Sequence, residues 1–197
     1  MTERIAWKGG ALLAPVPSAI VTCGCGDTVN ALTVAWTGIL ATKPPTTYIS
    51  VRPTRFSYNL IKETGEFVIN LCSSDMARAV DYCGMYTGAK VSKLERMHLD
   101  TVASEKVSVP TVSLAPLALE CRVKSCVPLG SHDMFIAEIE AITLHDKLLD
   151  SKGALHLERA NLLAYAHGHY YALGKQLGAF GFSAVRRHHK KAASGKK

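Results

Sequence analysis

The 197-residue chain is 48% hydrophobic and carries a formal net charge of +7. A chain of this length and apolar content is typical of one domain with a full hydrophobic core. No apolar run is long enough to cross a bilayer, and the first residues lack the charged-then-apolar pattern of a secretory signal. We therefore expect a cytoplasmic protein without a membrane partner.

The positive charge is unevenly distributed. Six of the 23 lysines and arginines lie within residues 186–197, a segment with no apolar period, so the rest of the chain is close to neutral. This pattern predicts a domain over residues 1–185 and a basic, disordered tail over 186–197. Such a tail either keeps the protein soluble or touches polyanions weakly, and we expect no specific nucleic-acid partner.

The cysteines do not form a recognisable metal or redox motif. Six of them lie at positions 23, 25, 72, 83, 121 and 126, without a paired Cys-x-x-Cys and matching Cys or His. We expect buried, reduced thiols and no metal site. Cys23-Gly24-Cys25-Gly26 has two interpretations, a redox pair or a tight turn, and the flanking glycines favour the turn.

The first clear element after a strand at 18–22 is a second strand at 30–37, where side chains alternate in size. Its bulky face carries Leu32, Val34 and Trp36, which we place in the core. Its other face is small, with Ala31, Thr33, Ala35 and Thr37. A small face allows close approach by a flat ligand or, alternatively, by another strand.

A strand at 47–51 then leads through Pro53 into a predicted helix at about 54–63. The first N–H groups of a helix lack intrahelical partners, and Arg52 and Arg55 add positive charge at the same point. This junction is a candidate phosphate site. The alternative is that Thr54 is an ordinary N-cap and that both arginines are solvated.

The remaining chain predicts mostly strands. Gly65 ends the helix before a strand at 66–71, in which Asn70 requires a polar partner, either a ligand or a neighbouring loop. A short helix is expected at 75–83, and strands at 119–127 and 135–141 form an antiparallel hairpin with His132 at the mouth of the second strand. These elements predict a mainly β fold with some α, a β-barrel with peripheral helices. A Rossmann fold is disfavoured because the Gly-rich turn at 23–26 leads into a strand.

Together these stretches resemble the flavin reductase-like, FMN-binding split-barrel family, particularly its flavoredoxin-like branch. The resemblance rests on the order and spacing of Asn30 to Trp36, Tyr48 to Tyr58, Glu66 to Leu71, Gly130-Ser131-His132 and Gly168 to Gly174. It covers about Ala14 to Ser183. It implies a homodimeric split β-barrel that holds FMN near the subunit interface.

The resemblance also assigns roles to individual residues. The strand at 33–37 would lie along the isoalloxazine ring, the 50–58 junction would hold the ribityl phosphate, and the loop at 87–90 would close over the cofactor. The cofactor-binding residues that it implies are Asn30, Thr33, Ala35, Trp36, Thr37, Ser50, Val51, Arg52, Arg55, Ser57, Tyr58, Asn70, Leu71, Thr87, Gly88 and Lys90.

His132 matches a catalytic histidine that many members place beside the flavin, where it orients a nicotinamide or stabilises reduced flavin. Many members read Gly-Asp-His here, whereas this chain reads Gly130-Ser131-His132-Asp133. The carboxylate that would orient the imidazole has therefore moved or been lost, which leaves the tautomer of His132 open, and a structural role for His132 is the alternative.

The sequence is compatible with three functions, each from a different class of protein. The first is an NAD(P)H-dependent flavin reductase or oxidoreductase that passes electrons through bound FMN to a small-molecule or protein acceptor. The second is a flavoredoxin-type carrier between protein partners, with no nicotinamide site of its own. The third is a basic-tailed binding domain without redox function.

Overall fold

The computed structural model describes residues 2–184. Its main sheet has seven strands, every neighbouring pair antiparallel, in the order β3-β2-β6-β9-β10-β5-β4. The strands are β2 (Ala19–Cys23), β3 (Asn30–Val34), β4 (Thr37–Thr42), β5 (Pro45–Val51), β6 (Glu66–Leu71), β9 (Leu117–Pro128) and β10 (Asp133–Leu144). The predicted basic tail over 186–197 lies outside the described residues.

The sheet curls into a split barrel. Its two edge strands, β3 and β4, follow each other in sequence and are joined only by Ala35 and Trp36, so the edges must come together. The backbone N–H of Ser50 donates to the carbonyl of Trp36 at 3.0 Å and ties β5 to this link. Buried apolar side chains from the barrel strands and from the helix over residues 56–64 fill the interior, among them Val21, Ile49, Ile61, Phe67 and Phe135. The predicted mainly β barrel is confirmed.

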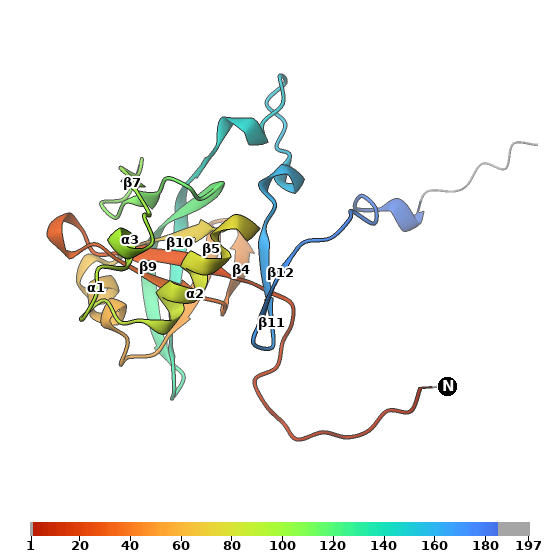
Figure 1. Cartoon of the computed structure of the whole chain (residues 1–197), viewed down its shortest axis with the longest axis horizontal. Helices are drawn as coiled ribbons and strands as arrows, with labels where there is room; N and C mark the ends of the chain where they lie inside the picture. The colour runs from red at the N-terminus through yellow and green to blue at the C-terminus, as the bar shows by residue number, and fades with distance from the viewer. Residues whose placement is uncertain (1, 185–197) are drawn as a thin grey trace, which may run out of the picture.

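The described residues form three α-helices (Figure 1): α1 (Phe56–Thr64), whose Ile61 reaches into the barrel core, α2 (Ala77–Met85) and α3 (Lys93–Arg96). Helix α1 ends as predicted at Gly65, which has a φ of 66° and donates its N–H to the carbonyl of Ile61. Helix α2 lies on the outer face of β2 and β3, where Val80 and Cys83 pack against Ile20 and Ala31. The C-terminal part of α2 therefore lies next to β3, with Gly84 beside Thr33.

A smaller sheet stands beside the barrel in the order β1-β11-β12, made of β1 (Val16–Pro17), β11 (Leu163–Ala166) and β12 (His169–Ala172). Strands β7 (Thr101–Val102) and β8 (Thr111–Val112) form a separate pair. The segments before β1 and after β12 leave the body as extended arms, drawn red-brown and blue in Figure 1. Both arms expose large apolar side chains, including Trp7 and Phe180.

Several local predictions are confirmed and one is wrong. The hairpin of β9 and β10 is antiparallel, and residues 24–26 form a turn in which Gly24 and Gly26 have positive φ. The alternation across 30–37 breaks, because β3 ends at Val34 and Trp36 belongs to the link before β4. Trp36 is consequently 45% exposed and is not a core residue.

All six cysteines are free thiols, and four of them are buried. Within residues 2–184, no group of three or more His, Cys, Asp or Glu side chains is arranged to hold a metal ion. None of the helices in that range is long and apolar enough to cross a membrane.

Candidate functional site

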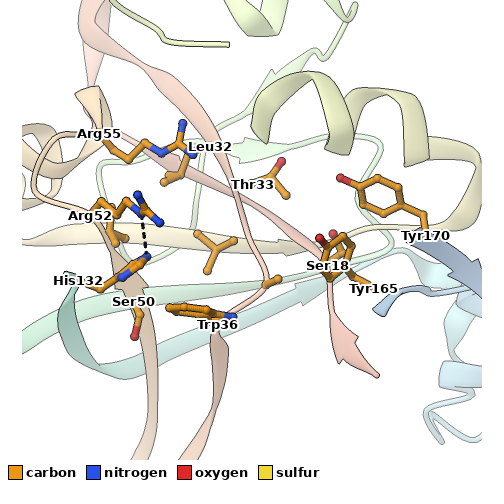
Figure 2. Close-up of a pocket in the computed structure, with 13 residues that line it drawn as sticks. Ser18, Leu32, Thr33, Trp36, Ser50, Arg52, Arg55, His132, Tyr165 and Tyr170 are labelled. Atoms are coloured by element: carbon orange, nitrogen blue, oxygen red, sulfur yellow. Dashed lines mark hydrogen bonds between the residues drawn. The ribbon is translucent and has the colours of Figure 1, made fainter. Parts of the chain in front are cut away.

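Two adjoining cavities open where the barrel edge meets α1 and α2. The aromatic cavity, of about 280 Å³, is lined by Ser18, Leu32, Thr33, Val34, Ala35, Trp36, Ser50, Val51, Arg52, Arg55, His132, Tyr165 and Tyr170. The helix-end cavity, of about 220 Å³, is lined by Leu32, Thr33, Arg52, Thr54, Arg55, Phe56, Ser57, Cys83, Gly84, Tyr86, Thr87, Gly88 and Lys93. Leu32, Thr33, Arg52 and Arg55 line both, and Figure 2 shows the side chains of Arg52 and Arg55 near each other on the His132 side of the aromatic cavity. The arrangement is an elongated trough with an aromatic end and a cationic end.

The helix-end cavity lies at the N-terminus of α1. Residues of its first turn line the cavity, and no acidic side chain occupies that turn. The N-terminal amides favour an anion there, and Arg52 and Arg55 add full charges. Arg55 Nη1 also donates to the carbonyl of Gly84 at 3.4 Å, which places it across the cavity at the end of α2. This end of the trough is built for an anion.

A third cation, Lys93, is only 3% exposed and lines the same cavity. Its Nζ donates to the carbonyl of Cys83 at 3.2 Å, near the C-terminal end of α2, where the helix dipole favours a cation. Burial lowers the pKa of Lys93. No carboxylate lines either cavity, and among the described residues no salt bridge involves Arg52, Arg55 or Lys93. A dianionic ligand would neutralise a buried charge that the protein itself leaves without a counterion.

The far end of the helix-end cavity is shaped by the loop between α2 and α3. Gly88 packs so tightly that an added Cβ would lie 2.2 Å from Asn30 Oδ1 and 2.8 Å from Phe56 Cδ1. Asn30 in turn donates through Nδ2 to Ser57 Oγ at 2.6 Å, and both residues are buried. A side chain at position 88 would displace the groups that form this end, so the close approach requires glycine.

Aromatic rings surround the other cavity. Trp36 and His132 pack together with ring centroids 4.6 Å apart and planes at 45°. Tyr165 and Tyr170, from β11 and β12, meet edge to face at 5.4 Å, and Figure 2 shows them on the side of the cavity opposite His132. The hydroxyl of Tyr170 donates to Asp81 Oδ1 at 3.3 Å, which anchors the small sheet to α2. A flat ring system suits the space between these groups.

His132 is held without a carboxylate. Arg52 Nε donates to His132 Nε2 at 3.4 Å, and because a guanidinium only donates, Nε2 is the acceptor and the ring proton lies on Nδ1, 2.9 Å from Ser131 Oγ. Partial burial, followed by the charges of Arg52 and Arg55, lowers the pKa of His132. The neighbouring carboxylate of Asp133 instead accepts a 2.6 Å hydrogen bond from the hydroxyl of Tyr58. The exchange of Asp and Ser around His132 thus gives a neutral imidazole of defined tautomer.

The structure brings eleven of the sequence-predicted residues onto the two cavities. They are Thr33, Ala35, Trp36, Ser50, Val51, Arg52, Arg55, Ser57, Thr87, Gly88 and His132. These residues come from β3, the link to β4, the β5–α1 junction, the loop before α3 and the turn before β10. The sequence and the family resemblance therefore located half of the 22 residues that line the two cavities.

Asn70 and Tyr58 line neither cavity. Asn70 is completely buried on the opposite face of the sheet, where Nδ2 donates to the carbonyl of Ile20 and Oδ1 accepts from the N–H of Val112. Its partners therefore lie on the neighbouring strands β2 and β8, and they are neither a ligand nor the loop that the sequence analysis offered as alternatives. Tyr58 packs on Phe135, with ring centroids 5.3 Å apart. Its hydrogen bond to Asp133, with burial, raises its pKa to about 12.

Four further predicted residues lie outside the two linings. Asn30 stands behind Ser57, and the Thr37 hydroxyl donates within the sheet to the carbonyl of Tyr48 at 2.6 Å. Leu71 packs against the barrel core. Lys90 lines a separate surface cavity beside α3, and the cation that reaches the helix-end cavity is Lys93.

Sequence reasoning missed Ser18, Phe56, Lys93, Tyr165 and Tyr170 as lining residues. Ser18 Oγ is buried and has no hydrogen-bond partner among the described residues. Tyr165 and Tyr170 follow in a segment whose aromatic content was visible, but no local pattern ties it to β3. Only the position of Phe56, at the start of the predicted helix next to Arg55, gave a usable signal.

With the fold and the trough defined, the class of protein follows. The chain matches the flavin reductase like domain over residues 12–174, and it belongs to that family of FMN-binding split-barrel proteins. It is 33% identical over 140 residues to an uncharacterized protein of Archaeoglobus fulgidus, covering 71% of this chain and 78% of the relative. It is 26% identical over 128 residues to an NADPH-flavin oxidoreductase of Streptomyces viridifaciens, covering 64% of each chain.

Among solved structures, the chain is similar to the flavoredoxin of Desulfovibrio vulgaris (Miyazaki F). The two are 27% identical, with a TM-score of 0.86, and the alignment covers 93% of this chain and all of the flavoredoxin chain. The predicted family, including its flavoredoxin-like branch, is confirmed.

The trough fits FMN on three observations made on this chain. Arg52, Arg55 and Lys93 surround a space with no carboxylate, as a phosphate dianion requires. The aromatic cavity beside it offers Trp36 and two tyrosines to a flat ring. Ser18 Oγ is a buried polar atom in need of a partner on the lining of that same cavity.

Proposed function

We propose that the protein is an FMN-dependent oxidoreductase that takes electrons from NADH or NADPH and passes them through bound FMN to a small-molecule or protein acceptor. The observation that carries FMN binding is the carboxylate-free group of three cations at the N-terminus of α1, continuous with a cavity walled by aromatic rings. When bound, FMN supplies the chemistry, because its ring takes a hydride from a nicotinamide and gives the electron pair to an acceptor.

The residues of the chain bind and orient the reactants. Arg52, Arg55 and Lys93 hold the phosphate, together with the amides of the first turn of α1 and the hydroxyl of Ser57. Trp36 and His132 form one side of the ring site, and Tyr165 and Tyr170 form the other. His132, neutral and protonated at Nδ1, presents no charge that would repel a nicotinamide cation leaving the site.

The second candidate function is a flavoredoxin-type electron carrier between protein partners, without a nicotinamide site. The similarity to the Desulfovibrio flavoredoxin over its whole length favours it. The similarity to an NADPH-flavin oxidoreductase favours the first candidate. Both candidates require bound FMN, and they differ in the electron donor.

One experiment tests the proposal in two stages. The purified protein is titrated with FMN, and binding is followed by flavin fluorescence. The complex is then mixed with NADH and with NADPH without oxygen, and the flavin absorbance is recorded. Prompt bleaching with either nucleotide supports the oxidoreductase, and a stable flavin spectrum with both identifies the carrier. Failure to bind FMN at micromolar levels overturns both and leaves a binding domain without redox function.

We further propose that the protein acts as a homodimer. Next to the aromatic cavity, β4 exposes Ile39 and Leu40 beside Trp36, and both extended arms expose apolar side chains without covering the body. A second copy is the occupant that would bury all of these surfaces together. Light scattering coupled to size exclusion is expected to give twice the mass of the chain, and a monomeric mass would remove this proposal.

A further inference from the structure

Lys93 is a buried amine at the cationic end of the trough, and its surroundings suit a reaction besides the binding of a phosphate. We infer that Lys93 is a modification site, at which small phosphorylated aldehydes form a reversible imine and thereby compete with FMN. This inference rests on the phosphate site of the proposed function, but it does not require that the protein carries electrons.

The side chain of Lys93 is enclosed by the protein and still reaches two cavities. It lines the helix-end cavity and an adjoining outer cavity of about 400 Å³. Its Nζ donates to the carbonyl of Cys83 at 3.2 Å, which fixes the direction of the side chain and leaves its other N–H groups without that partner. The carboxylates of Asp27 and Glu95 line the outer cavity, but among the described residues neither forms a salt bridge with Lys93. The amine is therefore held in place without a counterion.

The groups around Lys93 favour the neutral, nucleophilic form of the amine. Burial lowers the pKa of Lys93, and the charge of Arg55 acts in the same direction. Thiolates at Cys83 and Cys23 would act in the opposite direction, but burial raises the pKa of both thiols. A lysine that is desolvated and lies near another cation is the kind that forms imines with carbonyl compounds. At a given pH, a larger fraction of Lys93 than of a surface lysine is therefore nucleophilic.

The helix-end cavity also determines which aldehydes reach this amine. Arg52, Arg55 and the first turn of α1 offer a site for a phosphate, and they line the same cavity of about 220 Å³ as Lys93. Once its phosphate is bound there, a short aldehyde phosphate has its carbonyl carbon in the same small space as Nζ. An uncharged aldehyde lacks this anchor. The chemical class that the site fits is therefore a small phosphate monoester with an aldehyde group.

Imine formation needs no oxidant and no reductant. The lone pair of the neutral Nζ attacks the aldehyde carbon, the C–N bond forms, and a proton moves from nitrogen to the former carbonyl oxygen. Loss of this hydroxyl as water, together with the remaining proton of the nitrogen, gives the C=N bond, and addition of water reverses the reaction. The phosphate of the adduct occupies the site that the phosphate of FMN requires. The two ligands therefore exclude each other.

The test uses the purified full-length protein with D-glyceraldehyde 3-phosphate, and with glyceraldehyde as the same aldehyde without phosphate. Sodium borohydride reduces the imine to a stable secondary amine, which peptide mass spectrometry locates and quantifies. We expect the phosphorylated aldehyde to label Lys93 at least about tenfold faster than glyceraldehyde does, because charge-assisted contacts hold its phosphate beside the amine. This fast labelling should be absent in Lys93→Arg and unchanged in Lys90→Arg, the matched control, since Lys90 lines neither cavity that Lys93 lines.

Equal labelling rates with the two aldehydes, or labelling spread evenly over the lysines, overturn the inference. A parallel reaction with FMN at about ten times its dissociation constant tests the competition, and we expect it to slow the labelling of Lys93 by about tenfold. If FMN binds without protecting Lys93, the inference fails and the proposed function stands. If Lys93 is labelled selectively and FMN does not bind at all, the modification site stands and the proposed function fails.

Discussion

The two ends of the trough differ in how the chain builds them. The helix-end cavity takes most of its lining from two short stretches, the β5–α1 junction and the segment from the end of α2 to the start of α3, with Leu32 and Thr33 added by β3. The aromatic cavity takes its rings from distant points, with Trp36, His132 and Tyr170 spread over most of the chain. The first end therefore depends on local backbone geometry and charge, and the second depends on the whole fold. We therefore expect substitutions at the helix-end cavity to change mainly the affinity for the phosphate. Substitutions at the aromatic cavity are expected to change mainly the affinity for the flavin ring.

The largest effect is expected from the double substitution Arg52→Ala with Arg55→Ala. Loss of two charge-assisted contacts is expected to weaken FMN binding by about 2–4 kcal/mol. Riboflavin has the same ring but no phosphate, so its affinity is expected to change little. Fluorescence titrations with both ligands measure the difference, and Arg96→Ala, on α3 outside both cavities, is the control. An unchanged FMN dissociation constant would remove both arginines from the phosphate site.

Lys93 gives the next largest effect and adds a pH dependence. Lys93→Met is expected to weaken FMN binding by about 1.5–3 kcal/mol, the value of one hydrogen bond to a charged group. Because burial lowers the pKa of Lys93, the cation is fully present at pH values below that lowered pKa and is lost as pH rises through it. FMN affinity of the wild type should therefore fall on the alkaline side before an ordinary lysine would titrate.

Arginine at position 93 keeps its charge over the same range. Titrations of Lys93→Arg are expected to show FMN affinity that no longer falls where the wild type loses it. Parallel alkaline decline in the two proteins would mean that another group controls the pH dependence. Lys90→Met is the matched control, since Lys90 lines neither cavity.

At the aromatic end, Trp36→Ala should affect FMN and riboflavin equally. Stacking of one ring contributes about 0.5–1.5 kcal/mol beyond its buried area, and the ring is common to both ligands. Fluorescence titrations with FMN and with riboflavin measure the two losses of affinity. A larger loss for FMN than for riboflavin would show that the two ends are coupled, through the chain of Trp36, His132 and Arg52 contacts.

The contrast between the ends also explains what the sequence could predict. Arg52 and Arg55 were found because Pro53 ends a clearly alternating strand and a helix follows at once, which is a local signal. Lys90 came from the family resemblance, in a loop where no period fixes the register, and Lys93 was not considered. The structure places Lys93 at the start of α3 with its side chain buried.

Strand alternation predicts which side chains share a face of a strand. It does not predict which of the two faces borders the cavity. Asn70 was correctly placed opposite Phe67 and Ile69, yet that face meets strand β8 at Val112. Trp36 was placed in the core because alternation was extended past Val34, where hydrogen bonding between strands stops. Tyr165 and Tyr170 required the docking of a second sheet, which depends on long-range contacts that no local pattern encodes.

The smallest effect on FMN affinity is expected from His132→Ala, because the imidazole lies beside the ring site and makes none of the phosphate contacts. The expected change is instead kinetic: reduction of bound FMN by NAD(P)H should slow by about tenfold, which is about 1.4 kcal/mol in the barrier. Stopped-flow absorbance without oxygen measures the rate, and urea unfolding of the same variant checks the fold. Loss of folding would show that His132 is structural, through its packing on Trp36.

Substitution of Arg52 tests whether the charge of His132 matters, while the imidazole itself stays in place. Partial burial and the charges of Arg52 and Arg55 lower the pKa of His132, so in the wild type the imidazole is neutral at and above its ordinary pKa, and it gains a proton only at lower pH. In Arg52→Ala one of the two repelling charges is gone and the pKa of His132 should rise, which an NMR titration of the ring protons measures directly. If reduction of FMN then becomes slower as pH falls through the new pKa, the neutral ring is the form that the site uses. A reduction rate indifferent to that protonation would leave His132 with only its packing against Trp36, and the aromatic end would then act through shape alone.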